Sequence, residues 1–227
     1  GFKNKAYDGV YLEEGKEYKV SFYARAKAYS GSLKVEVTKD GTSYGSGNVD
    51  SITSEWSKYE VTIVSQDTVR HGDFAIVLNS PGQAEFDFIS CIPSDAVLGL
   101  FRQDLTQLLK DMDPGFLRFP GGCIVEGNEL TNRYQWKESI GRLEDRRSNW
   151  NRWAVHGNNK ENNFIGPYHH YNQTLGIGYY EYFLLSEYLG AKPIPIQNVG
   201  LACQYQSDEL VTIDSKEFPS YIQDTLD

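Results

Sequence analysis

The 227-residue sequence has only three cysteines, and they lie far apart, at Cys91, Cys123 and Cys203. Such an odd and sparse set excludes a disulfide framework, and without a Cys-x-x-Cys pair the spacing indicates no metal site. No apolar run is long enough to span a bilayer. Because the chain begins at Gly1 rather than Met, its true start is expected upstream, and the lack of a visible signal peptide does not decide the compartment.

Positive charge is also scarce, with 22 Lys and Arg against 31 Asp and Glu, a net charge of −9 and a pI near 5.0. An acidic chain repels phosphate backbones, so no nucleic acid partner is expected. A short arginine cluster, Arg146, Arg147 and Arg152, has Glu144 and Asp145 beside it. We expect these groups to form local salt bridges within a loop.

Aromatic residues are plentiful by contrast, with 16 Tyr and 11 Phe. Tyr and Trp offer flat apolar faces with a polar tip, which suits the CH and OH groups of a sugar ring. Strands also use Tyr and Phe for packing alone, so both interpretations stay open. Tyr23, Tyr29, Tyr44 and Trp56 are the candidates for a sugar platform, and the sequence does not say which face they occupy.

The sequence up to about residue 92 alternates apolar and polar residues with a period of two. The alternating apolar positions are Val20, Phe22, Ala24; Leu33, Val35, Val37; Tyr59, Val61, Ile63; Phe74, Ile76, Leu78; and Phe86, Phe88. Turn signals such as Asp40-Gly41 and Ser80-Pro81-Gly82 separate these runs. Short strands at this spacing predict an antiparallel, jelly-roll-like β-sandwich.

After Pro93 the period becomes helical. Apolar residues that share one helical face are Phe101, Leu105, Leu108, Leu109 and Met112. A short strand at Phe116–Phe119 follows, then a long polar loop, a helix near residues 177–189 that Gly190 ends, an apolar stretch at 194–196, and a helix starting near Lys216. This alternation predicts a parallel sheet, in which the loops after the strands, here those from Pro120 and Asn198, carry the chemistry. About 135 residues remain after residue 92, too few for a complete (β/α)₈ barrel, so a fragment is expected.

Four segments occur in order over residues 100–227: FLRFPGGCIVEG, NRYQWKESIG, GYYEYFLLSEYLGAKPIPIQNVG and ACQYQ. Together they resemble glycoside hydrolase family 51, the α-L-arabinofuranosidases. The segment GVYLEEGKEYKVSFYARA in the first half is similar to the carbohydrate-binding-module-type sandwich that some members carry. The resemblance implies a multi-domain chain, with a β-sandwich at residues 1–92 and part of a (β/α)₈ TIM barrel at residues 93–227.

The resemblance also implies the chemistry. A retaining arabinofuranosidase uses one Glu as acid/base and a second as nucleophile, and it needs no cofactor. In the family both lie on later barrel strands, so we expect them beyond Asp227 and no catalytic residue within this chain. The expected partner is an arabinose-containing polysaccharide or oligosaccharide such as arabinan or arabinoxylan, which favours a secreted or periplasmic protein. The alternative is a non-catalytic glycan-binding protein with a β-sandwich module.

Substrate-binding candidates gather where the strand Phe116–Phe119 ends. In the family, the position of Cys123 lines the arabinose pocket, and Gly121 with Gly122 would allow the backbone to approach a ligand or adopt a positive φ. Arg118 is expected to be buried and paired, orienting a barrel carboxylate, although an ion pair without bearing on the site would look the same. A structural, buried Cys123 is the alternative for that residue.

The remaining candidates lie in the loops of the second half. Asn198 follows a strand and is expected to support or contact the substrate, and Trp150 and Trp153, like Trp136, could stack on a sugar or only hold their loop in place. Glu129 sits in a Gly-Asn-Glu triplet that imitates the family's acid/base motif, but it lies in mid-loop, so neither it nor Glu126 is expected to be catalytic. His169 and His170 have no third ligand at suitable spacing, so no metal is expected there.

Overall fold

A computed structural model describes residues 1–5, 8–150, 172–205 and 207–227. The chain divides into two compact units, residues 1–108 and residues 109–227. No helix in the described part of the chain is long and apolar enough to cross a membrane.

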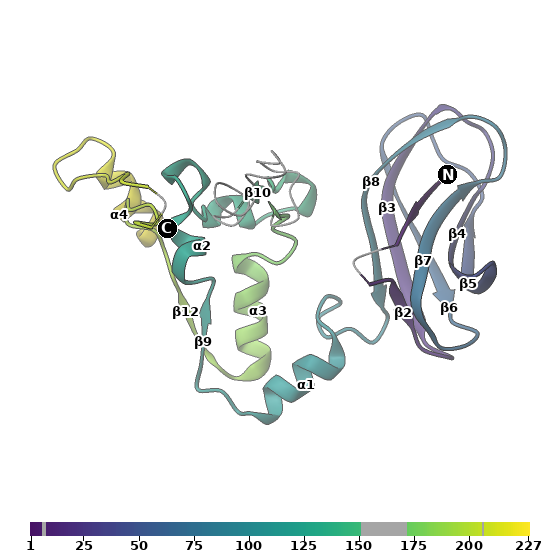
Figure 1. The fold of residues 1–227 in the computed structure, drawn as a ribbon, viewed down its shortest axis with the longest axis horizontal. Helices are drawn as coiled ribbons and strands as arrows, with labels where there is room; N and C mark the ends of the chain where they lie inside the picture. Colours follow the sequence, from purple (N-terminus) through teal and green to yellow (C-terminus); the bar gives the residue numbers. More distant parts are fainter. Residues whose placement is uncertain (6–7, 151–171, 206) are drawn as a thin grey trace. The chain divides into compact units, whose positions relative to one another are not determined.

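The first unit consists of two antiparallel sheets (Figure 1). Its strands are β1 (Phe2–Asn4), β2 (Val10–Leu12), β3 (Glu17–Ala28), β4 (Leu33–Lys39), β5 (Thr42–Val49), β6 (Ser57–Val64), β7 (Val69–Leu78) and β8 (Gln83–Pro93). One sheet has the order β1-β7-β4-β5, with β2 also paired to β7, and the other has the order β6-β3-β8. The predicted antiparallel sheets are therefore confirmed.

The alternating residues of both sheets form one core. Val20, Phe22 and Ala24 of β3 are fully buried, as are Val35 of β4 and Ile63 of β6. Because side chains of a strand alternate between its two faces, the intervening residues of β3 point outward. Burying a side chain as large as Phe22 contributes about 2–3 kcal/mol, so the period-two pattern supplies much of the stability of this unit.

The alternation fails in β8, where Phe88 was expected on the buried face together with Phe86. Ser90 pairs with Ser21 whereas Asp87 pairs with Tyr23, so β8 carries one extra residue between these pairs. Phe88 lies in this bulge with φ of 48° and is 43% exposed. The extra residue of a bulge breaks the alternation of side chains between the two faces of a strand. The prediction that Phe88 faces the core was wrong for that reason.

The second unit alternates helices and strands. Helix α1 (Gln103–Asp111) contains the boundary between the units, and its apolar face is exposed, with Met112, just beyond its end, 73% accessible. The elements that follow are β9 (Phe116–Phe119), α2 (Gly122–Glu126), three short 3₁₀ helices (Leu130–Asn132, Trp136–Ser139 and Leu143–Asp145), β10 (Asn149–Trp150), β11 (Asn172–Gln173), α3 (Tyr179–Leu189), β12 (Lys192–Pro195) and α4 (Phe218–Leu226). The strand at 116–119 and the last two helices lie where the sequence predicts them.

Strands β9 and β12 pair in parallel, with Arg118 opposite Ile194, and α3 packs against both (Figure 1). Phe119, 3% exposed, contacts the α3 rings of Tyr179 and Tyr182 at centroid distances of 5.4 and 4.9 Å. Gly190 ends α3 in the left-handed conformation, φ 74°, as predicted. A strand, a helix and a parallel strand thus form the α/β repeat expected from the sequence.

Candidate functional site

The turn that follows β9 contains a cis proline and two glycines. Pro120 follows Phe119 through a cis peptide bond, and Gly121 and Gly122 have φ of 78° and 55°. A Cβ on Gly121 would lie 2.0 Å from Nη1 of Arg118, a flexible side-chain end that can move, so the positive φ is the stronger reason for glycine at this position. Of the two roles expected for these glycines, a positive φ is observed at both, and approach to a ligand stays a prediction. The turn lets α2 begin directly after the strand.

Arg118 itself is exposed, not buried as expected. Neighbouring side chains of a strand point to opposite faces, and Phe119 faces α3, so Arg118 points to the face of β9 away from the helix. No ion pair involves Arg118 among the described residues. Nothing described covers this face of β9, so Arg118 is not buried within this chain, and its pairing with a barrel carboxylate stays a prediction.

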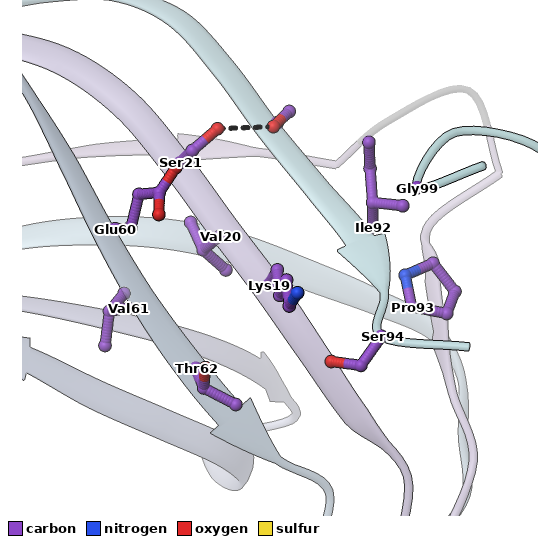
Figure 2. A pocket seen from close by; sticks show the side chains of 11 residues that line it. Lys19, Val20, Ser21, Glu60, Val61, Thr62, Ile92, Pro93, Ser94 and Gly99 are labelled. Carbon is purple, nitrogen blue, oxygen red and sulfur yellow. Dashed lines mark hydrogen bonds between the residues drawn. The ribbon is translucent and has the colours of Figure 1, made fainter. Parts of the chain in front are cut away.

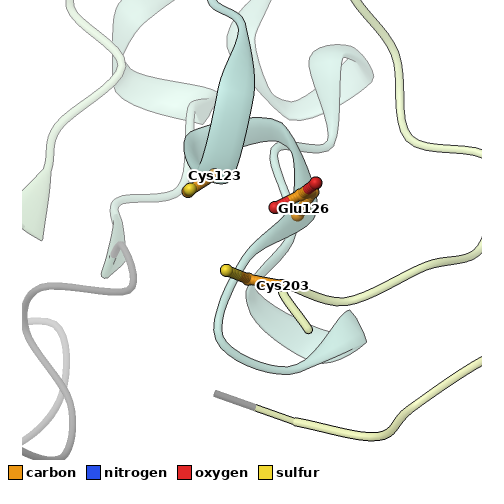
Figure 3. A group of neighbouring side chains, drawn as sticks. All are labelled: Cys123, Glu126 and Cys203. Atoms are coloured by element: carbon orange, nitrogen blue, oxygen red, sulfur yellow. The ribbon is translucent and has the colours of Figure 1, made fainter. Parts of the chain in front are cut away.

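Cys123, Glu126 and Cys203, side chains of types that can bind a metal ion, are neighbours in space (Figure 3). Cys123 and Glu126 are three residues apart on α2, a spacing that puts them on the same side of the helix. Cys203 reaches them from the segment after Asn198, and the two sulfur atoms and a Glu126 carboxylate oxygen all lie within 4.8 Å of one another. Sequence spacing alone indicated no such cluster, because Cys203 is distant from α2 along the chain.

Asn198 holds this arrangement together. Its Nδ2 donates hydrogen bonds to the carbonyl oxygens of Val125 (3.1 Å) and Leu201 (2.9 Å). Its Oδ1 accepts from the backbone N–H of Gly200 (2.6 Å) and of Leu201 (3.2 Å). Asn198 is 8% exposed, and both its Nδ2 and its Oδ1 form hydrogen bonds with backbone groups. These contacts favour a supporting role, the first of the two expected for it, over direct contact with a substrate.

Of the three tryptophan candidates, only the side chain of Trp136 is described. Trp153 lies outside the described residues, as do His169 and His170, and for Trp150 only the backbone is described, which pairs with Asn172. Trp136 is fully placed: its Nε1 donates to the carbonyl oxygen of Asp224 at 2.8 Å, and its ring stacks on Tyr179 at 5.7 Å. Trp136 therefore holds its loop in place.

Glu129 is exposed and belongs to a tight turn. Its backbone N–H donates to Oδ1 of Asn132 at 2.9 Å, and the neighbouring N–H of Asn128 donates to the same atom at 2.8 Å. The Gly-Asn-Glu triplet thus starts a 3₁₀ turn. That Glu129 is not a catalytic acid stays a prediction.

The sequence did not indicate the buried ion pair between Arg146 and Glu181. The Arg146 guanidinium contacts both carboxylate oxygens of Glu181 on α3, at 2.8 and 2.9 Å, and their side chains are 2% and 10% exposed. It also donates to the carbonyl oxygens of Gly141 and Leu175, both at 2.9 Å. The expectation of local pairing was wrong for Arg146, since its partner lies on another element, whereas Arg142 does pair locally with Glu144.

Burial disfavours the charged form of Glu181. The hydrogen bonds from Arg146 and from the N–H of Gly178 (2.8 Å) outweigh that effect and lower the pKa of this carboxyl. In the same region, burial raises the pKa of the Tyr134 hydroxyl to about 12. Glu181 is thus ionised but enclosed, which suits a structural anchor for the loop that holds Arg146.

In the first unit, the outward face of β6-β3-β8 combines aromatic and charged groups. The ring of Tyr23 meets that of Phe88 edge-on at 6.3 Å, and the Arg25 guanidinium lies 4.9 Å from the ring centre of Trp56, which is 42% exposed. Tyr29, by contrast, is 8% exposed. The structure thus separates the tyrosine candidates: Tyr23 and Trp56 are on the outer face, whereas Tyr29 is in the core and Tyr44 packs against it.

The same sheet carries a shallow pocket of about 300 Å³ (Figure 2). Lys19 and Ser21 of β3, Glu60 and Thr62 of β6 and Ser90 of β8 supply its polar groups, and the hydroxyls of Ser21 and Ser90 are 2.9 Å apart. Hydroxyl, ammonium and carboxylate groups together can both donate and accept hydrogen bonds. Such a surface suits a polyhydroxylated ligand.

The chain is modular, with a unit of two antiparallel β-sheets followed by an α/β unit. Residues 5–82 match the family model of a carbohydrate-binding domain, and residues 108–227 match that of the α-L-arabinofuranosidase 1 domain. The second match covers more than half of the chain, so the chain belongs to the α-L-arabinofuranosidases of glycoside hydrolase family 51.

Known relatives and structures agree with this family. The chain is 31% identical to α-L-arabinofuranosidase 2 of Arabidopsis thaliana, over all of this chain and 31% of that protein. It is 31% identical to an extracellular exo-α-L-arabinofuranosidase of Streptomyces chartreusis, over 96% of this chain and 26% of that protein. An arabinose-bound family 51 α-L-arabinofuranosidase shares the fold, with a TM-score of 0.79 and 22% identity, over 99% of this chain and 35% of that one. The chain therefore spans about a third of the length of these relatives.

Proposed function

We propose that the protein containing this chain is a retaining α-L-arabinofuranosidase, which releases terminal α-L-arabinofuranose from arabinan- or arabinoxylan-type chains. The family match over residues 108–227 carries this proposal. Within it, residues 1–92 form the carbohydrate-binding module and residues 93–227 the first part of a (β/α)₈ barrel. An arabinose-containing polysaccharide outside the cell would make it a secreted or periplasmic protein.

The geometry of β9 and β12 supports the barrel proposal. The two strands are parallel, and α3 covers one face of the pair. In a (β/α)₈ barrel the helices lie outside and the active site lies at the carboxyl ends of the strands. Arg118 would then face the interior, and Gly122 and Cys123 would lie at the mouth of β9. These three residues are our candidates for contact with the arabinose ring.

Arg118, Gly122 and Cys123 would have distinct roles. The guanidinium of Arg118 can donate paired hydrogen bonds to sugar hydroxyls or hold a barrel carboxylate. Gly122 is exposed and has no neighbouring atom within 4 Å of an added Cβ, so its backbone can approach a ligand. The Cys123 thiol would form a small, weakly polar wall for a furanose. Trp150 and Trp153 remain candidates for stacking on the leaving group, and Asn198 would position the loop beneath.

Hydrolysis tests the activity directly. The complete gene product should release 4-nitrophenol from its α-L-arabinofuranoside and not from its β-D-xylopyranoside, and proton NMR should show retention at the anomeric carbon. Because no catalytic residue is expected within residues 1–227, this chain alone should give no turnover. Inversion, or equal activity on the xyloside, would contradict the proposal.

The sandwich face supports sugar binding as a second function of the same protein. Tyr23 and Trp56 present aromatic surface beside Arg25 and the polar pocket of Lys19 and Glu60. Calorimetric titration with arabino-oligosaccharides should show that Tyr23→Ala and Trp56→Ala each weaken binding by about tenfold, while Tyr11→Ala on the other sheet has no effect. A gene product that binds these oligosaccharides but releases no arabinose would instead support the non-catalytic alternative.

A further inference from the structure

Cys123, Glu126 and Cys203 form a cluster, and the proposed hydrolysis uses only Cys123, as a wall of the sugar pocket. Two thiols and a carboxylate offer three ligand atoms, all within 4.8 Å of one another. Two of them come from α2 and the third from the segment that follows β12. The cluster is therefore a product of the tertiary fold.

Backbone hydrogen bonds hold the three side chains together. The N–H of Cys203 donates to the carbonyl oxygen of Gly127 at 3.0 Å, and the N–H of Gly127 donates to that of Cys123, also at 3.0 Å. Asn198 ties the Cys203 segment to α2 through the carbonyl oxygen of Val125. The approach of Cys203 to α2 is thus fixed by main-chain contacts and does not depend on the thiols themselves.

The donor set matches a thiophilic cation. Thiolates favour soft or borderline ions, and three protein ligands with an open fourth position are an established arrangement for Zn²⁺. Zn–S bonds are about 2.3 Å, which puts tetrahedral sulfur ligands about 3.8 Å apart. With ligand atoms no more than 4.8 Å apart, a contraction of at most about 1 Å between the sulfurs and about 1.3 Å between sulfur and oxygen would bring them into coordination distance.

We propose that Cys123, Glu126 and Cys203 bind a thiophilic divalent cation of the Zn²⁺ class, with a fourth position open to water. Metal binding deprotonates both thiols and releases their protons to solvent. A second consequence rests on the proposed function: because Cys123 would line the sugar pocket, the bound cation would keep arabinose out. The cluster then acts as a metal-sensitive block of the site.

Cadmium titration tests the site without any enzyme assay. Residues 1–227, reduced with a phosphine and shown to have three reactive thiols, should develop the ultraviolet cadmium–thiolate band with a stoichiometry of one, and Zn²⁺ should compete it away. Cys123→Ala and Cys203→Ala should each weaken Cd²⁺ binding at least 100-fold, and Glu126→Gln about tenfold. Cys91→Ala, in the first unit, is the matched control and should leave the titration unchanged.

Several results would overturn the site. They are absence of the band in the reduced protein, an unchanged band in Cys203→Ala, or its loss in Cys91→Ala. Glu126→Gln keeps both thiols, so it remains informative if a cysteine variant fails to fold by circular dichroism. In the complete gene product, Zn²⁺ should inhibit arabinofuranoside hydrolysis. A gene product without hydrolysis would refute the proposed function, while the Cd²⁺ titration would still decide the metal site.

Discussion

At the scale of single residues, Arg146 and Glu181 are the most consequential pair in the second unit. Both are nearly inaccessible to solvent, and each carboxylate oxygen has its own N–H donor on the guanidinium. Removing two charges from water is expensive, and good geometry with further hydrogen bonds must offset that cost. Here the carbonyl oxygens of Gly141 and Leu175 supply the further bonds.

Loss of one partner should therefore be severe. Arg146→Ala leaves the Glu181 carboxylate buried without its counter-charge, and we expect a loss of about 3–5 kcal/mol in the free energy of unfolding. Urea unfolding followed by tryptophan fluorescence measures it. The control is Arg142→Ala, whose side chain is 71% exposed beside Glu144 and whose loss should cost less than about 1 kcal/mol. Equal effects of the two variants would contradict the assignment.

Glu181 also predicts how stability depends on pH. Its pKa is lower in the folded protein, so its contribution is present above the unfolded pKa of about 4.3 and is lost as pH falls through the folded pKa. The stability difference between the wild type and Glu181→Gln should thus be largest near neutrality and shrink in acid. Unfolding midpoints measured from neutral to acid pH test this, with Glu144→Gln as control. A difference that grows in acid would have the wrong sign.

At the scale of elements, the start of α3 depends on close contact between two backbone segments. A Cβ on Gly178 would lie 1.9 Å from the carbonyl oxygen of Ser139. Ser139 Oγ in turn accepts the N–H of Tyr179 at 3.1 Å. Because Gly178 has no side chain, the second 3₁₀ helix, Trp136–Ser139, can lie directly against the N-terminal end of α3.

Gly178→Ala should therefore separate these segments. The clash is with backbone, which cannot rotate away, so we expect a loss of about 2–3 kcal/mol in unfolding free energy. Hydrogen exchange at Tyr179 should rise at the same time. The matched control is Gly176→Ala, where the nearest neighbouring atom is 3.6 Å from the added Cβ and the change should stay within about 0.5 kcal/mol. A stable Gly178→Ala variant would refute this packing.

At the scale of the whole molecule, the two units have separate cores. The main apolar cluster of the sandwich draws on strands β1 to β8, and the aromatic cluster around Phe119 and Tyr179 belongs to the second unit. A domain with its own core can in principle fold alone. The division agrees with the two family matches, which cover residues 5–82 and 108–227.

Residues 1–102, which end before α1, should accordingly fold by themselves. We expect a β-type circular dichroism spectrum and a cooperative thermal transition, because every buried residue of the sandwich core lies in this segment. Phe22→Ala, which empties the centre of that core, should cost about 3–5 kcal/mol and abolish the transition. A non-cooperative transition in the unmutated segment would show that the sandwich depends on the second unit.

Local pattern was sufficient for much of the fold. The period-two runs around Phe22 and Val35 locate strands, and Gly190 marks the end of α3, because these signals act over a few neighbouring residues. The bulge at Phe88 was missed because an inserted residue depends on pairing with β3. Arg146 was assigned to the wrong partner because Glu181 lies on a different element.

In the candidate site, too, some features follow from the sequence and others only from the tertiary structure. The sequence by itself determined the family, the strand that ends at Phe119 and the glycine turn at 121 and 122, since each depends on contiguous residues. Only the tertiary structure turned Asn198 into a support for α2 and brought Cys203 within 4.8 Å of Cys123. Parallel strands place their carboxyl ends side by side however much chain separates them, so side chains meet there that no local pattern connects.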